Sequence, residues 1–187
     1  MTHPQLIQGC QRFDRTAQRQ LFEEFYNLLF GIALRYSKNN EQAKEIFAKG
    51  FSSVCADIVE IKKDHNLESW LRKKMIRSCV QFLRSKRQEY FITSTVHLVG
   101  EEKRNEFDLF HQQIDPDPSN ISASQYLEAI QLLPPSFRAV YNLMVVDQFS
   151  LEDVVELLEI SGETCKYNLN KAKETLFKNI QHLQNAA

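Results

Sequence analysis

Lysine and arginine are concentrated between Ile61 and Tyr90, where nine basic residues stand against three acidic ones. Lys73 and Arg77 are four residues apart and Arg84 follows seven residues later, so all three share one side of a helix. Positive charge along one side of a packed helix attracts the phosphate backbone of nucleic acids. The stripe therefore predicts a nucleic-acid surface, with a merely solvated cationic face as the commoner alternative.

A polar loop precedes this basic helix and ends at Asn66, a plausible N-cap. A loop beside a cationic helix can hold a base that has left the stack, and an ordinary exposed loop is the alternative. The loop residues that could contact such a base are Lys62, Lys63, His65 and Asn66.

A second polar helix comes late in the chain, within "SLEDVVELLEISGETCKYNLNKAKETL". Leu151–Leu158 reads as a two-turn helix, Glu159–Ser161 as a turn, and a longer helix begins at Gly162. Its predicted buried face is Cys165, Leu169, Ala172, Leu176 and Ile180, and its outer face is Thr164, Tyr167, Asn168 and Lys171. This arrangement favours a helix-turn-helix whose second helix enters a major groove. The alternative is a three-helix bundle with a solvated last helix.

The sequence offers no candidate for catalysis. It contains no paired-carboxylate motif, no glycine-rich phosphate loop and no metalloprotease motif. The four cysteines lack C-x-x-C spacing and have no neighbouring histidine, so no zinc site is expected. We therefore expect a non-enzymatic protein without a metal or cofactor.

The elements that must position these surfaces are all predicted to be helical. Helices over 18–36, 41–61 and 67–87 carry apolar stripes at spacings of three and four, which predicts a three-helix bundle. Asn40 is the expected cap of the second helix. Helices over 124–133 and 137–146, followed by the helix-turn-helix, predict a second, four-helix domain. The expected fold is all-α, with domains at 1–90 and 124–187 joined by an acidic linker at 91–123.

The composition fits a soluble globular protein of one or two small domains. The 187 residues are 43% hydrophobic and 25% charged, and the net charge is -1. A net charge this close to zero does not by itself indicate which class of partner the protein binds. The longest apolar stretch, Leu28–Leu34, is too short to span a bilayer, and no secretory signal is evident, so we expect a cytoplasmic protein.

Three segments resemble the extracytoplasmic-function sigma factors, the small two-domain class of bacterial transcription initiation factors. "LESWLRKKMIRSCVQFLRSKR" resembles the family's promoter-melting helix, with matches at Trp70, Leu71, Val80, Phe82, Leu83 and Arg84. The segment Leu133–Leu176 resembles the second conserved domain without a gap, and Glu41–Phe51 looks like the helix that binds core RNA polymerase.

This resemblance implies roles for particular residues. The -10 element would be bound by Lys62, Lys63, His65, Asn66, Lys73, Arg77 and Arg84. The -35 element would be bound by Arg138, Thr164, Lys166, Tyr167, Asn168 and Lys171. The polymerase clamp would be bound by Ala43, Glu45, Ile46, Ala48 and Lys49. The implied partners are core RNA polymerase, promoter DNA and an anti-sigma factor, and the free protein is expected to be a monomer.

Two other functions remain open at this point. A stand-alone helix-turn-helix repressor would need a dimer and a two-fold operator, but no dimerisation helix is evident. A degenerate sigma-like protein would bind polymerase or a regulator without melting DNA. Its best support is Ala48 and Lys49, because the family usually has glutamine and an acidic residue there.

Overall fold

The computed structural model describes residues 1–61, 66–86 and 121–185. Within these ranges the secondary structure is helical and contains no strand. The chain divides into two compact units, Met1–Phe82 and Leu83–Ala187, which are described separately. Most of the predicted acidic linker lies outside the described residues.

The first unit contains α1 (His3–Gln11), α2 (Arg15–Tyr36), α3 (Asn40–Asp57), a short 3-10 turn η1 (Ile58–Glu60) and most of α4 (Leu67–Ser85). The predicted apolar stripes form its core. Fully buried members from α2, α3 and α4 include Leu21, Leu29, Ile46, Leu71 and Met75. At Gly50 an added Cβ would lie 2.6 Å from the Met75 sulfur, so α3 and α4 are in close contact there.

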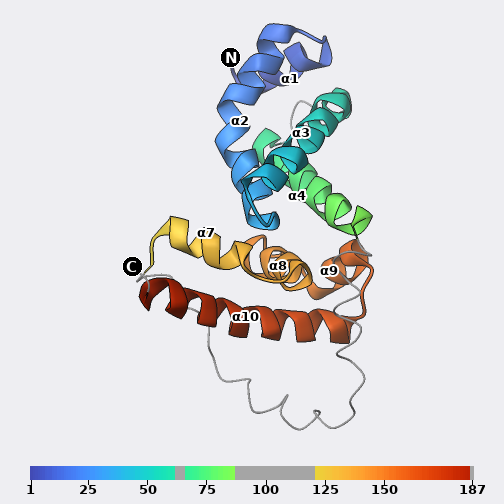
Figure 1. Cartoon of the computed structure of the whole chain (residues 1–187). Coiled ribbons are helices and arrows are strands. Elements are labelled where there is room, and N and C mark those ends of the chain that lie inside the picture. The colour runs from blue at the N-terminus through green and yellow to red at the C-terminus, as the bar shows by residue number, and fades with distance from the viewer. Residues whose placement is uncertain (62–65, 87–120, 186–187) are drawn as a thin grey trace. The chain divides into compact units, whose positions relative to one another are not determined.

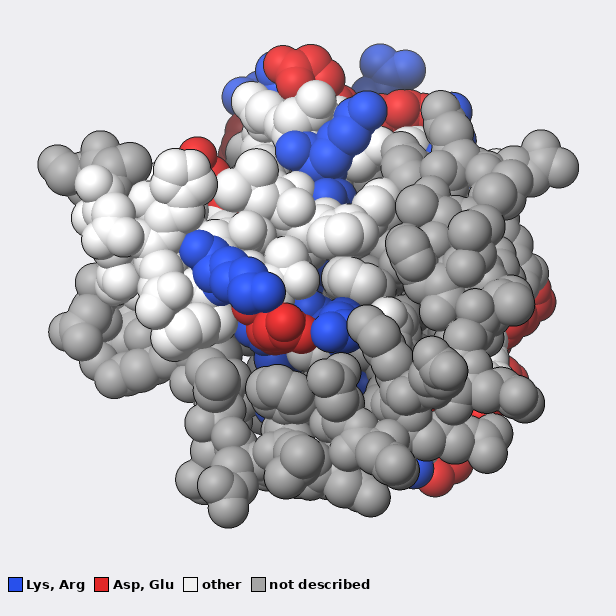
Figure 2. Space-filling model, turned by 60° about the horizontal axis from the view of Figure 1, so that its bottom comes forward, with Lys and Arg blue, Asp and Glu red and all other residues white. Residues whose placement is uncertain are grey.

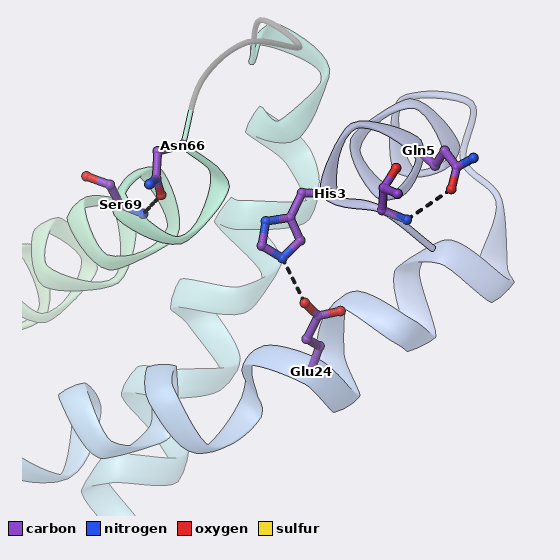
Figure 3. A network of polar contacts seen from close by, with 6 residues as sticks. His3, Gln5, Glu24, Asn66 and Ser69 are labelled. Atoms are coloured by element: carbon purple, nitrogen blue, oxygen red, sulfur yellow. Dashed lines mark hydrogen bonds and ion pairs between the residues drawn. The ribbon is translucent and has the colours of Figure 1, made fainter.

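Helix α1 was not expected from the sequence, and it adds a helix to the three predicted for this domain. A capping box between Thr2 and Gln5 starts it. The Gln5 side chain, labelled in Figure 3, accepts a hydrogen bond from the Thr2 backbone N–H at 2.9 Å. Leu6, Ile7 and Cys10 are buried, and α1 packs on α2 (Figure 1). Nine residues with few apolar positions give a weak periodicity signal, so the tertiary contact decides this helix.

Asparagine caps start α3 and α4. The Asn39 side chain accepts a hydrogen bond from the Gln42 backbone N–H at 3.0 Å, so the predicted cap at Asn40 was wrong by one residue. The Asn66 cap is confirmed, because its Oδ1 accepts from the Ser69 N–H at 2.9 Å (Figure 3).

The second unit contains α7 (Ala123–Gln131), α8 (Pro135–Tyr141), the π-helical turn η5 (Asn142–Val146), α9 (Leu151–Leu158) and α10 (Gly162–Asn185). Helices α7 and α8 pack along α10 (Figure 1). Their shared core is Ala129, Ile130, Leu133, Tyr141, Ala172, Leu176 and Ile180. The predicted helix over 137–146 is present but changes its hydrogen bonding at Asn142.

The predicted helix-turn-helix is present at the expected residues. Ser150 and Asp153 form the capping box of α9, with the Asp153 N–H donating to Ser150 Oγ at 3.1 Å. Glu159 ends α9 in the left-handed region (φ 53°), which turns the chain sharply. Ser161 Oγ then accepts from the Thr164 N–H at 3.0 Å at the start of α10.

Candidate nucleic-acid interface

The basic stripe of α4 is exposed. Lys73, Arg77 and Arg84 are all solvent-exposed, while Leu71 and Met75 on the other side are fully buried. Helical spacing therefore separates the cations from the core as predicted. Such a surface can contact several phosphates along one DNA strand without sequence selectivity.

Another cation of α4, Lys74, has partners within the protein. The Lys74 ammonium lies 2.7 Å from Asp57 Oδ2 on α3 and above the Trp70 ring. Ser53 Oγ donates to the same carboxylate oxygen at 3.2 Å. The hydrogen bond from Lys74 is the main cause of a lowered pKa at Asp57. Lys74 thus ties α4 to α3 and is not part of the DNA stripe.

The loop before α4 is only partly described. Lys62, Lys63 and His65 lie outside the described residues, so their predicted contacts stay predictions. Asn66 is exposed, and its side-chain Oδ1 accepts the capping hydrogen bond from the Ser69 N–H.

The predicted polymerase-binding set on α3 divides into buried and exposed residues. Ala43 and Ile46 are fully buried, so they support the helix from the core and cannot contact a partner directly. Glu45, Ala48 and Lys49 are exposed. The Lys49 ammonium lies 2.8 Å from the Glu45 carboxylate and 5.3 Å from the Phe82 ring centroid, so this cation also has intramolecular partners.

The outer face of α10 presents four of the predicted DNA-contacting residues. Lys166 is exposed, and Thr164, Tyr167 and Lys171 are partly exposed. Thr164 Oγ1 lies 2.8 Å from the capping Ser161 hydroxyl. Hydroxyl, phenol and ammonium groups near the start of a helix suit contacts to base edges and phosphates.

Asn168 does not belong to this outer face, and that part of the prediction was wrong. Its side chain is 1% exposed, and both its amide nitrogen and oxygen are buried without a hydrogen-bond partner. The helix is rotated slightly from the predicted phase, so Asn168 is buried while Leu169 is only partly buried. A side chain this deeply buried does not reach a base edge.

Arg138 is also buried, which does not fit its predicted contact with the -35 element. Its side chain is 3% exposed. The guanidinium donates to the backbone carbonyl oxygens of Ile130 at 3.2 Å, Gln131 at 2.7 Å and Leu133 at 2.6 Å. These carbonyls lie at the C-terminal end of α7 or just after it, where few backbone donors are in reach, and the Ile130 oxygen also accepts from the Leu133 N–H at 3.1 Å. Arg138 therefore stabilises the α7–α8 corner.

Positive charge does not form one continuous patch among the described residues on the face shown in Figure 2. On the face shown in Figure 2, blue Lys and Arg side chains lie in separate groups between uncharged and acidic ones. This agrees with a net charge of -1. Weak DNA affinity is the expected consequence for the protein alone.

Asp57 is a residue that supports α4 and that the sequence did not indicate. It lies 17 residues before Lys74, and neither spacing nor composition connects the two. Only the packing of α3 against α4 brings them together.

The described cysteines and helices add no further chemistry. Burial raises the pKa of Cys10 to about 11 and also raises the pKa of Cys55 and Cys165, so thiolates are disfavoured. Among the described residues no group of side chains is arranged to hold a metal ion. None of the described helices combines the length and apolar character needed to cross a bilayer.

An exposed basic helix in one helical unit and a helix-turn-helix in another define a class of two-part DNA-binding transcription proteins. Models of sigma-70 region 2 and sigma-70 region 4 match residues 21–89 and 123–176, together about two-thirds of the chain. The chain belongs to the sigma-70 family and is of its extracytoplasmic-function class. Its role is that of a sigma factor, which directs core RNA polymerase to specific promoters.

Two relatives from Bacillus subtilis (strain 168) are similar over most of their length. The chain is 20% identical over 181 residues to the ECF RNA polymerase sigma factor SigW, covering 95% of this chain and 96% of SigW. It is 22% identical over 160 residues to the RNA polymerase sigma factor SigV, covering 85% and 81%.

Solved structures of similar proteins include two complexes. One is the sigma factor RpoE with the anti-sigma factor NepR from Bartonella quintana (16% identity, TM-score 0.49, covering 87% of this chain and 96% of that one). The other is CnrH with the cytosolic domain of CnrY (14% identity, TM-score 0.45, covering 98% and 97%).

Proposed function

We propose that this sigma factor uses α4 to open the -10 element and α10 to read the -35 element. The observation that carries the proposal is the exposure of Lys73 and Arg77 opposite a fully buried apolar stripe, inside the region 2 match. Each nucleotide of an opened DNA strand carries a phosphate whatever its base, so a cationic face suits binding of the separated strand.

We assign the following residues to each step. The proposed -10 set is Lys62, Lys63, His65, Asn66, Lys73, Arg77 and Arg84. The proposed -35 set is Thr164, Lys166, Tyr167 and Lys171, without the buried Arg138 and Asn168. The proposed clamp contacts are Glu45, Ala48 and Lys49, held in place by the buried Ala43 and Ile46.

The proposed partners follow from this role. Core RNA polymerase supplies the catalytic centre and promoter DNA is the target, both in the cytoplasm. We also propose an anti-sigma factor as the inhibitor, as the resemblance to the extracytoplasmic-function class implies. We propose that the free protein is a monomer, because α4 and α10 would each act once per promoter.

Transcription in vitro with purified core polymerase tests the assignment. The full-length chain with a promoter library should yield transcripts from a small set of promoters that share -35 and -10 elements. Arg77→Ala and Arg84→Ala should lose open-complex formation while still binding core polymerase. Arg72→Ala is the matched control on α4, because Arg72 is paired with Glu68 and is not in the stripe.

Other outcomes identify the competing functions. A chain that binds core polymerase but opens no promoter would be a degenerate sigma-like protein. The ion pair between Lys49 and Glu45 is the observation that supports this alternative. Specific DNA binding by a dimer without core polymerase would indicate a repressor. Unchanged open-complex formation by Arg77→Ala would contradict the role assigned to the α4 stripe.

A further inference from the structure

Glu174 on α10 forms ion pairs with two lysines of the same helix. The Lys171 ammonium donates to Glu174 Oε2 at 2.8 Å, and the Lys178 ammonium donates to Oε1 at 3.1 Å. Both carboxylate oxygens are therefore in use, and the hydrogen bond from Lys171 is the main cause of a lowered pKa at Glu174. The three side chains together carry a single positive charge, although two ammonium groups are present.

The glutamate lies on the face of α10 that is proposed to contact the -35 element. Lys171 follows Tyr167 by four residues, and Glu174 follows Tyr167 by seven. Side chains four and seven residues apart lie above one another on a helix, so Glu174 is in line with these proposed DNA contacts. The side chains of Lys171 and Glu174 are each 44% exposed. The face proposed to approach DNA thus contains an exposed carboxylate.

A carboxylate at this position opposes phosphate binding but does not reach the bases. It repels an approaching phosphate and occupies ammonium groups that would otherwise bind one. Thr164, at the start of α10, is ten residues away, about 15 Å along the helix axis. Contacts to base edges there are made without Glu174. The carboxylate therefore lowers the affinity for DNA of any sequence more than it lowers the reading of bases.

We propose that Glu174 is a specificity-determining residue for the -35 element, which suppresses sequence-independent DNA binding by α10 through its two lysine partners. The inference rests on the proposed role of α10 at the -35 element. Lys178 lies beyond the region 4 match, which ends at residue 176, so the last turns of α10 supply the second lysine. Ion pairs that only stabilise the helix would affect the melting temperature and not DNA binding.

The test compares Glu174→Gln, which removes the charge with little change in size, with Glu128→Gln. Glu128 is an exposed glutamate on α7 of the same unit, so its replacement removes an equal charge from a different helix. Each full-length variant is combined with cognate core polymerase. The holoenzyme is then bound to duplexes with an intact or a scrambled -35 element over a range of salt concentrations. The readouts are the affinity for each duplex, the salt slope and the melting temperature.

Glu174→Gln should bind the scrambled duplex about fivefold more tightly and steepen the salt slope by about one, because a lysine becomes available for a phosphate. Preference for the intact -35 element should fall by about threefold, and Glu128→Gln should keep the wild-type values. A scrambled-duplex affinity and a salt slope equal to those of Glu128→Gln would overturn the proposal. Absence of any preference for the intact element by the wild-type holoenzyme would instead refute the proposed function.

A second variant covers the case in which Glu174→Gln does not fold. Glu174→Ala removes the same carboxylate and introduces the residue with the highest helix propensity. The double variant Glu174→Ala/Lys178→Ala also removes one released lysine, so part of the gain in affinity for the scrambled duplex should be lost. A gain that shrinks in this way supports the proposal. Wild-type affinity of Glu174→Ala, or a gain that Lys178→Ala does not reduce, contradicts it.

Discussion

The cationic stripe of the first unit and the buried arginine of the second unit have opposite environments. In the first unit Lys73 and Arg77 are exposed on α4, opposite a buried stripe. In the second unit the Arg138 side chain is 3% exposed, and its guanidinium donates hydrogen bonds to three backbone carbonyls. Both kinds of residue stand in segments that resemble DNA-binding regions of one family. The comparison teaches that a basic residue in such a segment can contact DNA only if packing leaves its side chain exposed.

Arg138→Ala should give the largest effect on stability. It removes a charged donor from three carbonyls at a buried corner, so the free energy of unfolding should fall by about 3 kcal/mol. Urea denaturation of the full chain measures this. The matched control is Lys166→Ala on exposed α10, which should leave stability unchanged and weaken promoter binding. Normal stability of Arg138→Ala with selective loss of -35 binding would return Arg138 to the DNA-contacting set.

The double variant Lys73→Gln/Arg77→Gln should show the reverse pattern. Loss of about two phosphate contacts should weaken holoenzyme binding to promoters about tenfold and reduce the salt slope by about two. Filter binding over a range of salt concentrations measures both quantities, and the unfolding transition should not move. An unchanged salt slope would mean that the stripe is only solvated.

Asn168→Leu should stabilise the second unit by about 1 kcal/mol, because it replaces a buried amide that has no partner with an apolar group of similar size. Asn179→Leu is the opposite control, since the Asn179 amide donates to the Ala129 carbonyl at 3.0 Å and its loss should destabilise. Thermal unfolding of both variants measures the difference. Destabilisation by Asn168→Leu would show that the amide is satisfied in solution.

Asp57→Asn should give the smallest effect and should depend on pH. Because the folded-state pKa of Asp57 is lowered, its contribution is present at neutral pH and is lost as the pH falls through that pKa. The carboxylate is about one-third exposed, so we expect about 0.5 kcal/mol at pH 7. Denaturant midpoints of both proteins should converge in acid, and a gap that persists there would contradict the ionic role.

Strong periodicity made most of the fold predictable. Helices α2, α4, α9 and α10 begin and end close to the residues expected from their apolar spacing and caps. Helix α1 was not predicted, because it is short and is stabilised by the burial of three side chains where it packs on α2. The exposed residues of each site could be predicted from the same periodicity, but the burial of Arg138 and Asn168 could not. One hundred degrees of rotation per residue leaves a side chain such as Asn168 at the border between faces.

The sequence by itself determined that the segments other than α1 are helical, where the helix-turn-helix bends and which charges lie on α4, because spacing and capping act over a few residues. Only the tertiary structure decided that Arg138 and Asn168 are internal and that Lys74 pairs with Asp57. Each of these depends on contacts between helices, and a helix shows which of its faces is covered only when its neighbours are in place.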